Sequence, residues 1–497
     1  MTRSVRAVAA LALLALTGCA ETGSGGPGGG TGTTAAVPTW LGGKGMNATM
    51  FSTLKPGVYE PSTLAVGQEK DITLHRAEGF GFVRSAALEQ YLNETRARLV
   101  AVSGKTNVPG RVIILADQTY GAVTTPDGNT YVTLGFIEAL ESDDEVAALL
   151  AHETSHELLK HHNSDILGDM QKKGQSLLEL GMGAKAALAG HGAMGKSDTR
   201  TVQEAQLAGM ATDKLVLPAW SRGQEREADF LGLDLLVESQ QSAPAMMGVL
   251  EKLQAWEKAS AESEQAFTGR LTQASQHNLN EAADVVYQKL LSGASVNHPK
   301  TEERISDTAQ YLEKFYGSRE LAEPKTAAWK AVRARPEVAQ VLRNYKAAFA
   351  ARRLYEQGKA QESYAMAKTA LNGRQLTDAY PNWVFSDAAF ALGRSGEGFA
   401  ALRRAIASPE PVAVIYEDLI TRNEQTNSLR TALEVCDTAS RVFGGAPRFI
   451  PPKIRVLRKM GRTAEAESLT VSCSLNTPDF KRLCQQANQT PAGNVQR

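Results

Sequence analysis

The sequence predicts an α+β protein in two parts: a mostly helical domain with a small sheet, followed by an all-α domain of helical repeats. Three observations support this. Apolar residues recur with helical periodicity over 84–102, 143–162 and 224–239. Short apolar runs at 111–115 and 131–134 predict strands. In the last third of the chain, turn markers recur roughly every 30–40 residues, which is typical of repeated helix pairs.

Length and charge set the broad class. The chain has 497 residues, 42% of them hydrophobic and 22% charged, which is enough for two or more domains with cores of their own. Lys plus Arg and Asp plus Glu both number 54, so the formal net charge is zero. A neutral chain has no global field that would draw it to nucleic acid or to anionic lipid. We therefore expect no nucleic-acid partner.

The N-terminus has the pattern of a targeting signal, in which two arginines precede a short apolar run over 8–16. This run is too short to span a bilayer. Leu16-Thr17-Gly18 then precede Cys19, an order that resembles the bacterial lipobox, where cleavage occurs before a cysteine that becomes lipidated. An ordinary secretory peptide with a chance cysteine is the alternative. We expect residues 1–18 to be a lipoprotein signal peptide and Cys19 to be the membrane anchor.

Residues 19–63 include a Gly/Thr-rich tract and are expected to be the anchor and a flexible tether. Alanine rather than aspartate follows the anchor cysteine, which by resemblance to Gram-negative sorting rules indicates the outer membrane, facing the periplasm. Three further cysteines lie near the C-terminus, in what should be an oxidising compartment. Cys473 and Cys484 are the favoured pair because they enclose a short loop, and Cys436 would then be a buried thiol. The sequence leaves the connectivity open.

The domain boundaries follow changes in composition. Residues 64–318 are expected to form one domain, 319–340 a linker, and 341–490 repeats that resemble tetratricopeptide repeats, with an unrelated helical bundle as the alternative. The glycine-punctuated segment 163–221 is expected to lie over the active site as helices and loops. The turn markers of the repeats are Gly358-Lys359, Gly396-Glu397, Asn427-Ser428 and Gly461-Arg462.

The segment His152-Glu153-Thr154-Ser155-His156 carries the strongest chemical signal. Residues four apart share one face of a helix, so both imidazoles can bind one metal ion, and Glu153 can reach a water beside it. Such a five-residue pattern also arises by chance, so it needs support from elsewhere in the chain.

A second helix supplies that support. Glu225 can complete the set of two histidines and one glutamate that is typical of catalytic zinc with an open fourth position. Asp229, one turn further, can accept a hydrogen bond from a ligand imidazole. The alternative is a solvated acidic face formed by Glu225, Glu227 and Asp229. Together with the first motif, the pattern predicts one zinc ion per chain, held by His152, His156 and Glu225.

These residues resemble the gluzincin metallopeptidases of the HtpX, BepA and CAAX prenyl-peptidase family over residues 64–318. The lead-in at 142–151 and the segment Glu225–Asp229, similar to ExEAD, carry most of the resemblance. Asn297-His298-Pro299 followed by Arg304 is similar to the family's downstream His-Pro element. Residues 120–132 occupy the place of its strand and Gly-containing turn but lack the usual Asn-Ala-Phe start. A lipid anchor with C-terminal repeats narrows the resemblance towards BepA-like envelope proteases.

The resemblance implies metal-assisted peptide hydrolysis, with Glu153 as general base and with His298 and Arg304 as stabilisers of the oxyanion. It implies a membrane-anchored endopeptidase that degrades misfolded or stalled envelope proteins, while the repeats recruit substrate or an assembly machine. A repeat-based scaffold or chaperone with a silent or latent peptidase fold is one alternative. A maturation protease with a single partner is another.

Two further expectations concern histidines. His298 is expected to occupy the fourth zinc position in a resting state, with segment 163–221 covering the cleft. His161 and His162 follow the metal motif and are expected to lie on a solvated helix face.

Overall fold

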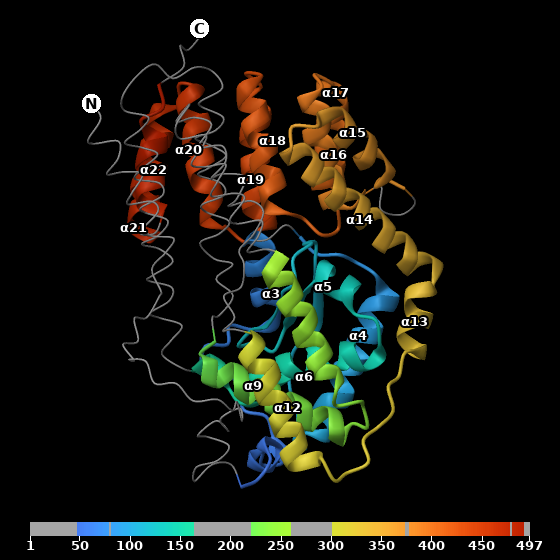
Figure 1. Ribbon diagram of the computed structural model, residues 1–497. Helices are drawn as coiled ribbons and strands as arrows, with labels where there is room; N and C mark the ends of the chain where they lie inside the picture. The colour runs from blue at the N-terminus through green and yellow to red at the C-terminus, as the bar shows by residue number, and fades with distance from the viewer. Residues whose placement is uncertain are drawn as a thin grey trace, which may run out of the picture.

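The computed structural model describes residues 47–78, 81–163, 220–259, 301–372, 377–477 and 480–491. Within these ranges the chain is mostly helical with two small sheets, as predicted (Figure 1). None of the helices in the described ranges is both long and apolar enough to span a membrane. Residues 1–18, Cys19, His298 and nearly all of segment 163–221 lie outside the described residues, so what was expected of them stays a prediction.

The larger sheet has three strands in the order β3 (Val112–Leu115), β5 (Thr130–Thr133) and β4 (Ala122–Thr124). β3 and β5 run parallel, and β4 runs antiparallel to β5 across a turn whose Gly128 has φ +80°. All four residues of β5 are buried, as expected of a central strand covered on both faces. A second sheet pairs β1 (Gly57–Val58) in parallel with β2 (Lys105–Thr106).

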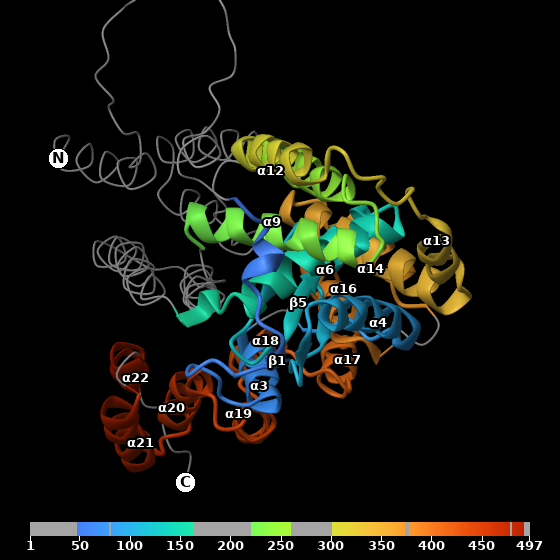
Figure 2. The same cartoon turned by 90° about the horizontal axis from the view of Figure 1, so that it is seen from below.

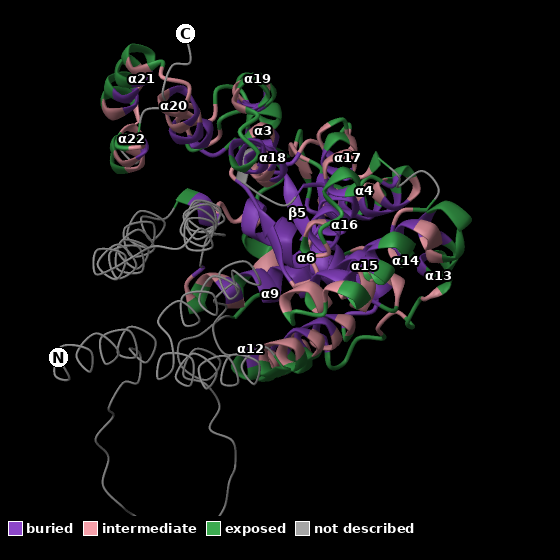
Figure 3. Ribbon diagram, turned by 90° about the horizontal axis from the view of Figure 1, so that it is seen from above, coloured by how far each residue is buried: buried purple, intermediate pink, exposed green. Residues whose placement is uncertain are grey.

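The two faces of the larger sheet pack against different layers. Because side chains alternate along a strand, Ile113, Val123 and Tyr131 point to one face, where they form a cluster that includes Ile72 of α3 (Gln68–Glu78). The opposite face packs against α4 (Ala86–Val102) and α6 (Asp143–Leu158). Figure 3 shows the strands as a buried layer within the fold.

Two capped helices lie side by side on the α6 face of the sheet. The Ser142 side chain accepts a hydrogen bond from the Glu145 amide and starts α6. Ser221 and Gln224 form a capping box that starts α9 (Arg222–Glu238). The outermost layer is α12 (Thr301–Tyr316), so the order from outside inwards is α12, α9, α6 and the sheet (Figure 2). α5 (Leu134–Ala139) follows β5 directly.

The helix expected over 143–162 is shorter than predicted. α6 ends at Leu158, Lys160 adopts a left-handed φ of 55°, and the chain continues as the short 3-10 helix η2 (His161–Asn163). A left-handed residue turns the chain away from the helix axis. His161 is therefore directed back towards α6 instead of continuing along it.

The C-terminal part consists of helical hairpins. Its helices are α13 (Ala327–Ala334), α14 (Pro336–Glu356), α15 (Ala360–Thr369), α16 (Ala379–Ala391), α17 (Ser395–Ile406), α18 (Ala413–Gln425), α19 (Leu429–Val442), α20 (Ile450–Lys459), α21 (Thr463–Asn476) and α22 (Lys481–Asn488). Two further 3-10 helices are η1 (Met50–Thr53) and η4 (Pro447–Phe449), and another helix spans residues 245–259.

Four of the hairpin turns are built alike. Each has one residue with positive φ, and these residues, Gly358, Gly393, Asn427 and Gly461, recur every 34 or 35 positions. In each turn the next amide donates to the carbonyl five residues earlier, at 2.8–2.9 Å, which is the Schellman arrangement. The marker predicted at Gly396 falls inside α17, so the turn lies three residues earlier. The period equals that of tetratricopeptide repeats, and assignment to that class stays a prediction.

The two parts share one core. Trp329 of α13, inside the predicted linker, donates its indole N–H to the Leu140 carbonyl at 2.8 Å and stacks on Tyr91. On the α3 side, Arg76 forms an ion pair with Glu410 at 2.8 Å. α18 thus packs against α3, on the side of the sheet away from α6 and α9, and the hairpins lie at that end of the molecule (Figure 1).

The cysteines pair as favoured from the sequence. Cys473 of α21 and Cys484 of α22 form a disulfide, and Cys436 is a buried free thiol on α19. Burial raises the pKa of the Cys436 thiol to about 12, so this thiol stays protonated and unreactive at neutral pH.

Candidate metal centre

Two helices bring together the three residues expected to bind zinc. α6 carries His152 and His156 one turn apart, and α9 carries Glu225. One ligand atom from each of the three lies within 4.8 Å of the other two, and all three residues are buried. The Nε2 atoms of the two histidines are 3.1 Å apart, and Glu225 Oε2 lies 3.6 Å from His152 Nε2.

This donor set fits zinc. Two imidazole nitrogens and one carboxylate oxygen are the ligands of many catalytic zinc sites. Burial, together with the neighbouring charge of His152, holds the pKa of His156 well below its usual value. His156 is therefore neutral and offers a lone pair, as metal binding requires.

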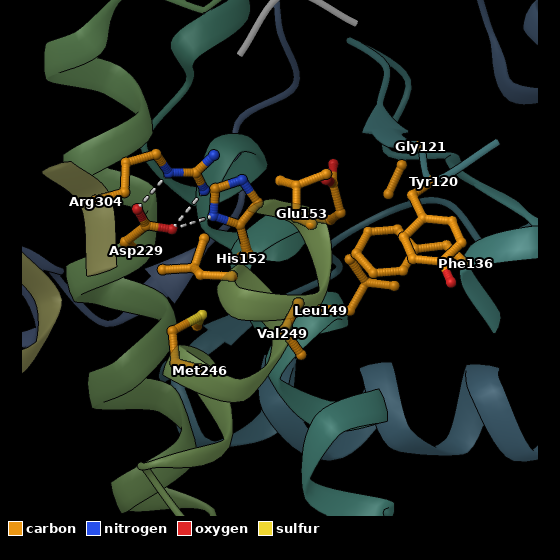
Figure 4. Close-up of a pocket in the computed structure, with 13 residues that line it drawn as sticks. Tyr120, Gly121, Phe136, Leu149, His152, Glu153, Asp229, Met246, Val249 and Arg304 are labelled. Atoms are coloured by element: carbon orange, nitrogen blue, oxygen red, sulfur yellow. Dashed lines mark hydrogen bonds and ion pairs between the residues drawn. The ribbon is translucent and has the colours of Figure 1, made fainter. Parts of the chain in front are cut away.

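The outer nitrogen of His152 faces a carboxylate. Nδ1 lies 2.9 Å from Asp229 Oδ1. Burial lowers the pKa of His152, but the hydrogen bond to Asp229 and the charge of Asp229 outweigh it, so the pKa is raised overall. Figure 4 shows this contact beside the pocket. The position of Asp229 matches the supporting role predicted for it, which stays a prediction.

Arg304 of α12 contacts the carboxylates of both Asp229 and Glu225. Its Nε and one terminal nitrogen donate to the two oxygens of Asp229, each at 2.8 Å, and its other terminal nitrogen lies 2.9 Å from Glu225 Oε2. Burial alone would raise the pKa of Asp229. The charge and hydrogen bonds of Arg304 lower the pKa by more than burial raises it, so Asp229 is ionised. These contacts place Arg304 as an orienting group for Asp229 and Glu225. Its expected role at an oxyanion stays a prediction, as does that of His298.

Glu153 follows His152 and points into the pocket beside the centre (Figure 4). Its side chain is buried, and the hydroxyl of Thr124 on β4 donates to its Oε2 at 3.4 Å. The expected general base therefore lies between the ligand histidines and the outer strand of the sheet.

The pocket beside Glu153 has about 390 Å³ of space not filled by atoms, part of it open to solvent. Its wall is mainly apolar, and Tyr120 stacks between Phe136 and Trp256 with ring centroids 5.2 and 5.8 Å apart. The helix at 245–259 contributes four of the apolar lining residues, Met246, Val249, Leu250 and Leu253.

The solvated face expected for His161 and His162 is wrong. Both rings are buried, with 5% and 1% of their surface exposed. His161 Nδ1 lies 2.9 Å from His156 Nδ1, and its Nε2 lies 3.1 Å from Glu227 Oε2. The reason is the left-handed turn before η2, which continuing helical periodicity could not reveal.

Trp220 was also missed. Its ring stacks on His156, with centroids 4.5 Å apart and planes inclined by 20°. The available signal was its place just before Ser221, the capping residue of α9. Nothing in the local sequence linked it to a histidine on another helix.

The comparisons with known proteins agree with this geometry. A model of peptidase family M48 matches residues 86–311. Mitochondrial metalloendopeptidase OMA1 of Schizosaccharomyces pombe is 24% identical over 248 residues, which are 50% of this chain and 60% of that protein. The beta-barrel assembly-enhancing proteases of Escherichia coli K12 and Yersinia pestis are 24% and 27% identical over 206 and 171 residues.

These matches cover 40% of this chain and of the E. coli protein, and 33% of this chain and 32% of the Y. pestis protein. The chain thus spans less than two thirds of the length of each of these relatives. The matched range contains both helices of the metal centre, the base and the pocket. Residues 86–311 of this chain are thus similar to the metallopeptidase domains of family M48.

Proposed function

We propose that this chain is a zinc metalloendopeptidase that cuts unfolded or misassembled proteins of the bacterial envelope. The observation that carries the proposal is the convergence of His152, His156 and Glu225 beside a buried Glu153. A complete set of ligands with an adjacent base supports an enzyme more than a scaffold with a silent peptidase fold, because a scaffold needs neither.

The side chains have separate tasks in this proposal. Zinc, when bound by the three ligands, supplies Lewis acidity for a water and a peptide carbonyl. Glu153 takes the proton of the attacking water and later gives it to the leaving amine. Asp229 orients His152, and Arg304 holds Asp229 and Glu225 in place.

The substrate is proposed to bind as an extended strand. In the described part of the chain β4 pairs only with β5, so its other edge is available for an added strand. Thr124 connects this edge to Glu153. Extended binding requires an unfolded segment, because folded proteins keep their backbone groups paired. The apolar pocket would take a large apolar side chain next to the cleaved bond.

Location and partners extend the proposal beyond the domain. Two of the relatives are named for enhancing β-barrel assembly. We propose that a lipidated Cys19 anchors this chain to a membrane, on the periplasmic side of the outer membrane, and that the hairpins bind an assembly partner. The resting-state block by His298 belongs to the same proposal.

Glu153→Gln tests the chemistry. Wild type and variant should each bind one zinc per chain, since the ligands remain, while cleavage of an unfolded casein substrate falls by about 100–10,000-fold in the variant. Glu302→Gln, an exposed change on α12, is the matched control and should keep full activity. Zinc without cleavage in the wild type would favour the scaffold, and loss of zinc in Glu153→Gln would make Glu153 a ligand.

Peptide substrates test the pocket. Two fluorogenic peptides that differ only in the residue beside the cleaved bond, leucine in one and alanine in the other, should differ in kcat/KM by about 10–200-fold in favour of leucine. Equal rates would remove the pocket from the proposal and leave the metal centre untouched.

A further inference from the structure

We propose that His161 is a positioning residue for the metal centre and that, with Glu227 behind it, it fixes which ring nitrogen of His156 faces the metal. This inference rests on the proposed zinc site. It gives a role to a buried histidine and a glutamate that the catalytic proposal does not use.

The two nitrogens of His156 face different neighbours. Nε2 faces His152 Nε2 at 3.1 Å, on the side where the three ligands converge. Nδ1 faces away from that point and lies 2.9 Å from His161 Nδ1. His156 is therefore held at both nitrogens, and only Nε2 is placed to bind a metal.

The contacts are consistent with one arrangement of protons. If Nε2 of a neutral His156 offers its lone pair, the proton must be on Nδ1. That N–H then donates to His161 Nδ1, so the proton of His161 must be on its own Nε2. This second N–H donates to Glu227 Oε2, 3.1 Å away. Each proton has one acceptor, and neither histidine needs to be charged.

Packing keeps this chain of contacts in place. The left-handed Lys160 sets the direction of η2, and Gln224 donates from its side chain to the His161 carbonyl at 3.1 Å. Trp220 covers one face of the His156 ring. Rotation of His156 would lose the contact with His161 and disturb the stack with Trp220.

The outer nitrogens of the two expected histidine ligands are thus held in different ways, although both of the carboxylates involved, Asp229 and Glu227, come from α9. His152 faces Asp229, which is buried and paired with Arg304. On its outer side, Nδ1 of His156 is linked to a carboxylate through His161, and the Glu227 side chain at the end of that path is 52% exposed. Partners that orient ligand imidazoles typically affect metal affinity by about 10–100-fold when removed.

Three substitutions at one position test the inference. His161→Leu removes the acceptor for His156 Nδ1–H, whereas His161→Asn keeps an acceptor near the place of the lost Nδ1. His161→Gln places its amide near the position of Nε2, so it should not restore the contact with His156 Nδ1. If His161→Leu does not fold, His161→Gln takes its place as the variant without that contact. The readout is the zinc dissociation constant of the full chain, measured by competition with a chromophoric chelator.

We expect His161→Leu and His161→Gln to weaken zinc binding by about 10–100-fold and His161→Asn to recover most of the loss. Glu227→Leu should weaken binding in the same direction by a smaller factor. His162→Leu is the matched control, because His162 is equally buried and also lies against Trp220, with ring centroids 4.8 Å apart. It should bind zinc as the wild type does.

Several results would overturn the inference. Wild-type affinity in His161→Leu, no recovery in His161→Asn, or an equal loss in His162→Leu would each reduce His161 to a packing residue. None of these would affect the proposed function, because the wild type would still bind zinc. Absence of zinc binding in the wild type would overturn the proposed function and this inference with it.

Discussion

In the helical hairpins, buried arginines and a carboxylate alternate along the first helices of successive hairpins, whereas in the metallopeptidase domain buried polar side chains converge on one point. Asp387 of α16 lies between Arg352 of α14 and Arg422 of α18, at 3.0 and 2.8 Å. In the metal centre, two histidine nitrogens and a carboxylate oxygen face one another. The first arrangement is balanced by the chain itself, and the second offers a set of ligands for an added cation.

This difference separates two uses of buried charge. We call Arg352, Asp387 and Arg422 the hairpin ladder. Successive members are 35 positions apart, which is one repeat length, so each charge meets its partner in the neighbouring hairpin. Such pairs add little net stability compared with apolar packing but cost much when one partner is removed. If the three expected ligands bind an ion as proposed, part of the stability of their domain depends on that ion.

The largest expected effect is the gain in the free energy of unfolding that bound zinc provides. Zinc at a thousandfold excess over its dissociation constant should raise the free energy of unfolding of the metallopeptidase domain by about 4 kcal/mol. Glu225→Gln should lose most of this gain, because a neutral amide is a poorer donor than a carboxylate. Denaturant unfolding with zinc and with a chelator measures it, and Asp387→Asn should keep the full gain. The same gain in Glu225→Gln and wild type would break the comparison.

The second largest effect is the loss of stability when the hairpin ladder loses its carboxylate. Asp387→Ala leaves two buried arginines with only their partners on the same helix and should lower the free energy of unfolding by about 3 kcal/mol. Zinc affinity should not change. Asp437→Ala removes an exposed ion pair with Lys453 and should cost less than about 1 kcal/mol. Similar losses in thermal or denaturant unfolding of the two variants would show that breaking the buried ladder costs no more stability than breaking an exposed ion pair.

A third arrangement, a buried acid held only by neutral donors, predicts a pH effect. Asp234 accepts from the Phe51 amide and from the hydroxyls of Tyr311 and Tyr316, and burial raises its pKa to about 6. The folded state then binds a proton more tightly than the unfolded state. Between pH 7 and pH 4, wild-type stability relative to Asp234→Asn should rise by on the order of 2 kcal/mol as pH falls. A flat difference across that range would contradict the raised pKa.

The smallest effects concern the turns between paired helices. At Gly393 the backbone φ is +72° and a side chain would meet no neighbour, so Gly393→Ala should cost only the strain of that conformation, about 1 kcal/mol. Asn427→Gly, at the equivalent turn, should change stability by a few tenths of a kcal/mol. Thermal unfolding of both variants checks this. A large loss in Asn427→Gly would mean that the asparagine side chain has a further task.

The parts that the sequence predicts well are those fixed by local pattern. The helices with the metal motif and with Glu225, the strands β3 and β5, and the positions of three of the four hairpin turns follow from periodicity, caps and turn residues. The burial of His161 depends on one left-handed residue, and the grip of Arg304 on Asp229 joins residues 75 positions apart. Single-sequence periodicity carries neither kind of information.

The hairpin ladder is an intermediate case. Arg352, Asp387 and Arg422 occupy the same place in successive repeats, so alignment of the chain with itself at the repeat length would have put opposite charges in one column. The apolar pocket offers no such signal, because strand, helix and loop residues meet there only after the domain has folded.

One glycine determines how closely the two helices of the metal centre approach each other. At Gly232, where α9 crosses α6, a Cβ atom would lie 3.1 Å from the His152 backbone nitrogen and 2.7 Å from the end of the Met246 side chain. The end of the Met246 side chain is free to turn aside, but the α6 backbone at His152 would have to shift by a few tenths of an ångström. The missing side chain thus lets α9 approach the backbone of α6 at the residue where the histidine motif begins.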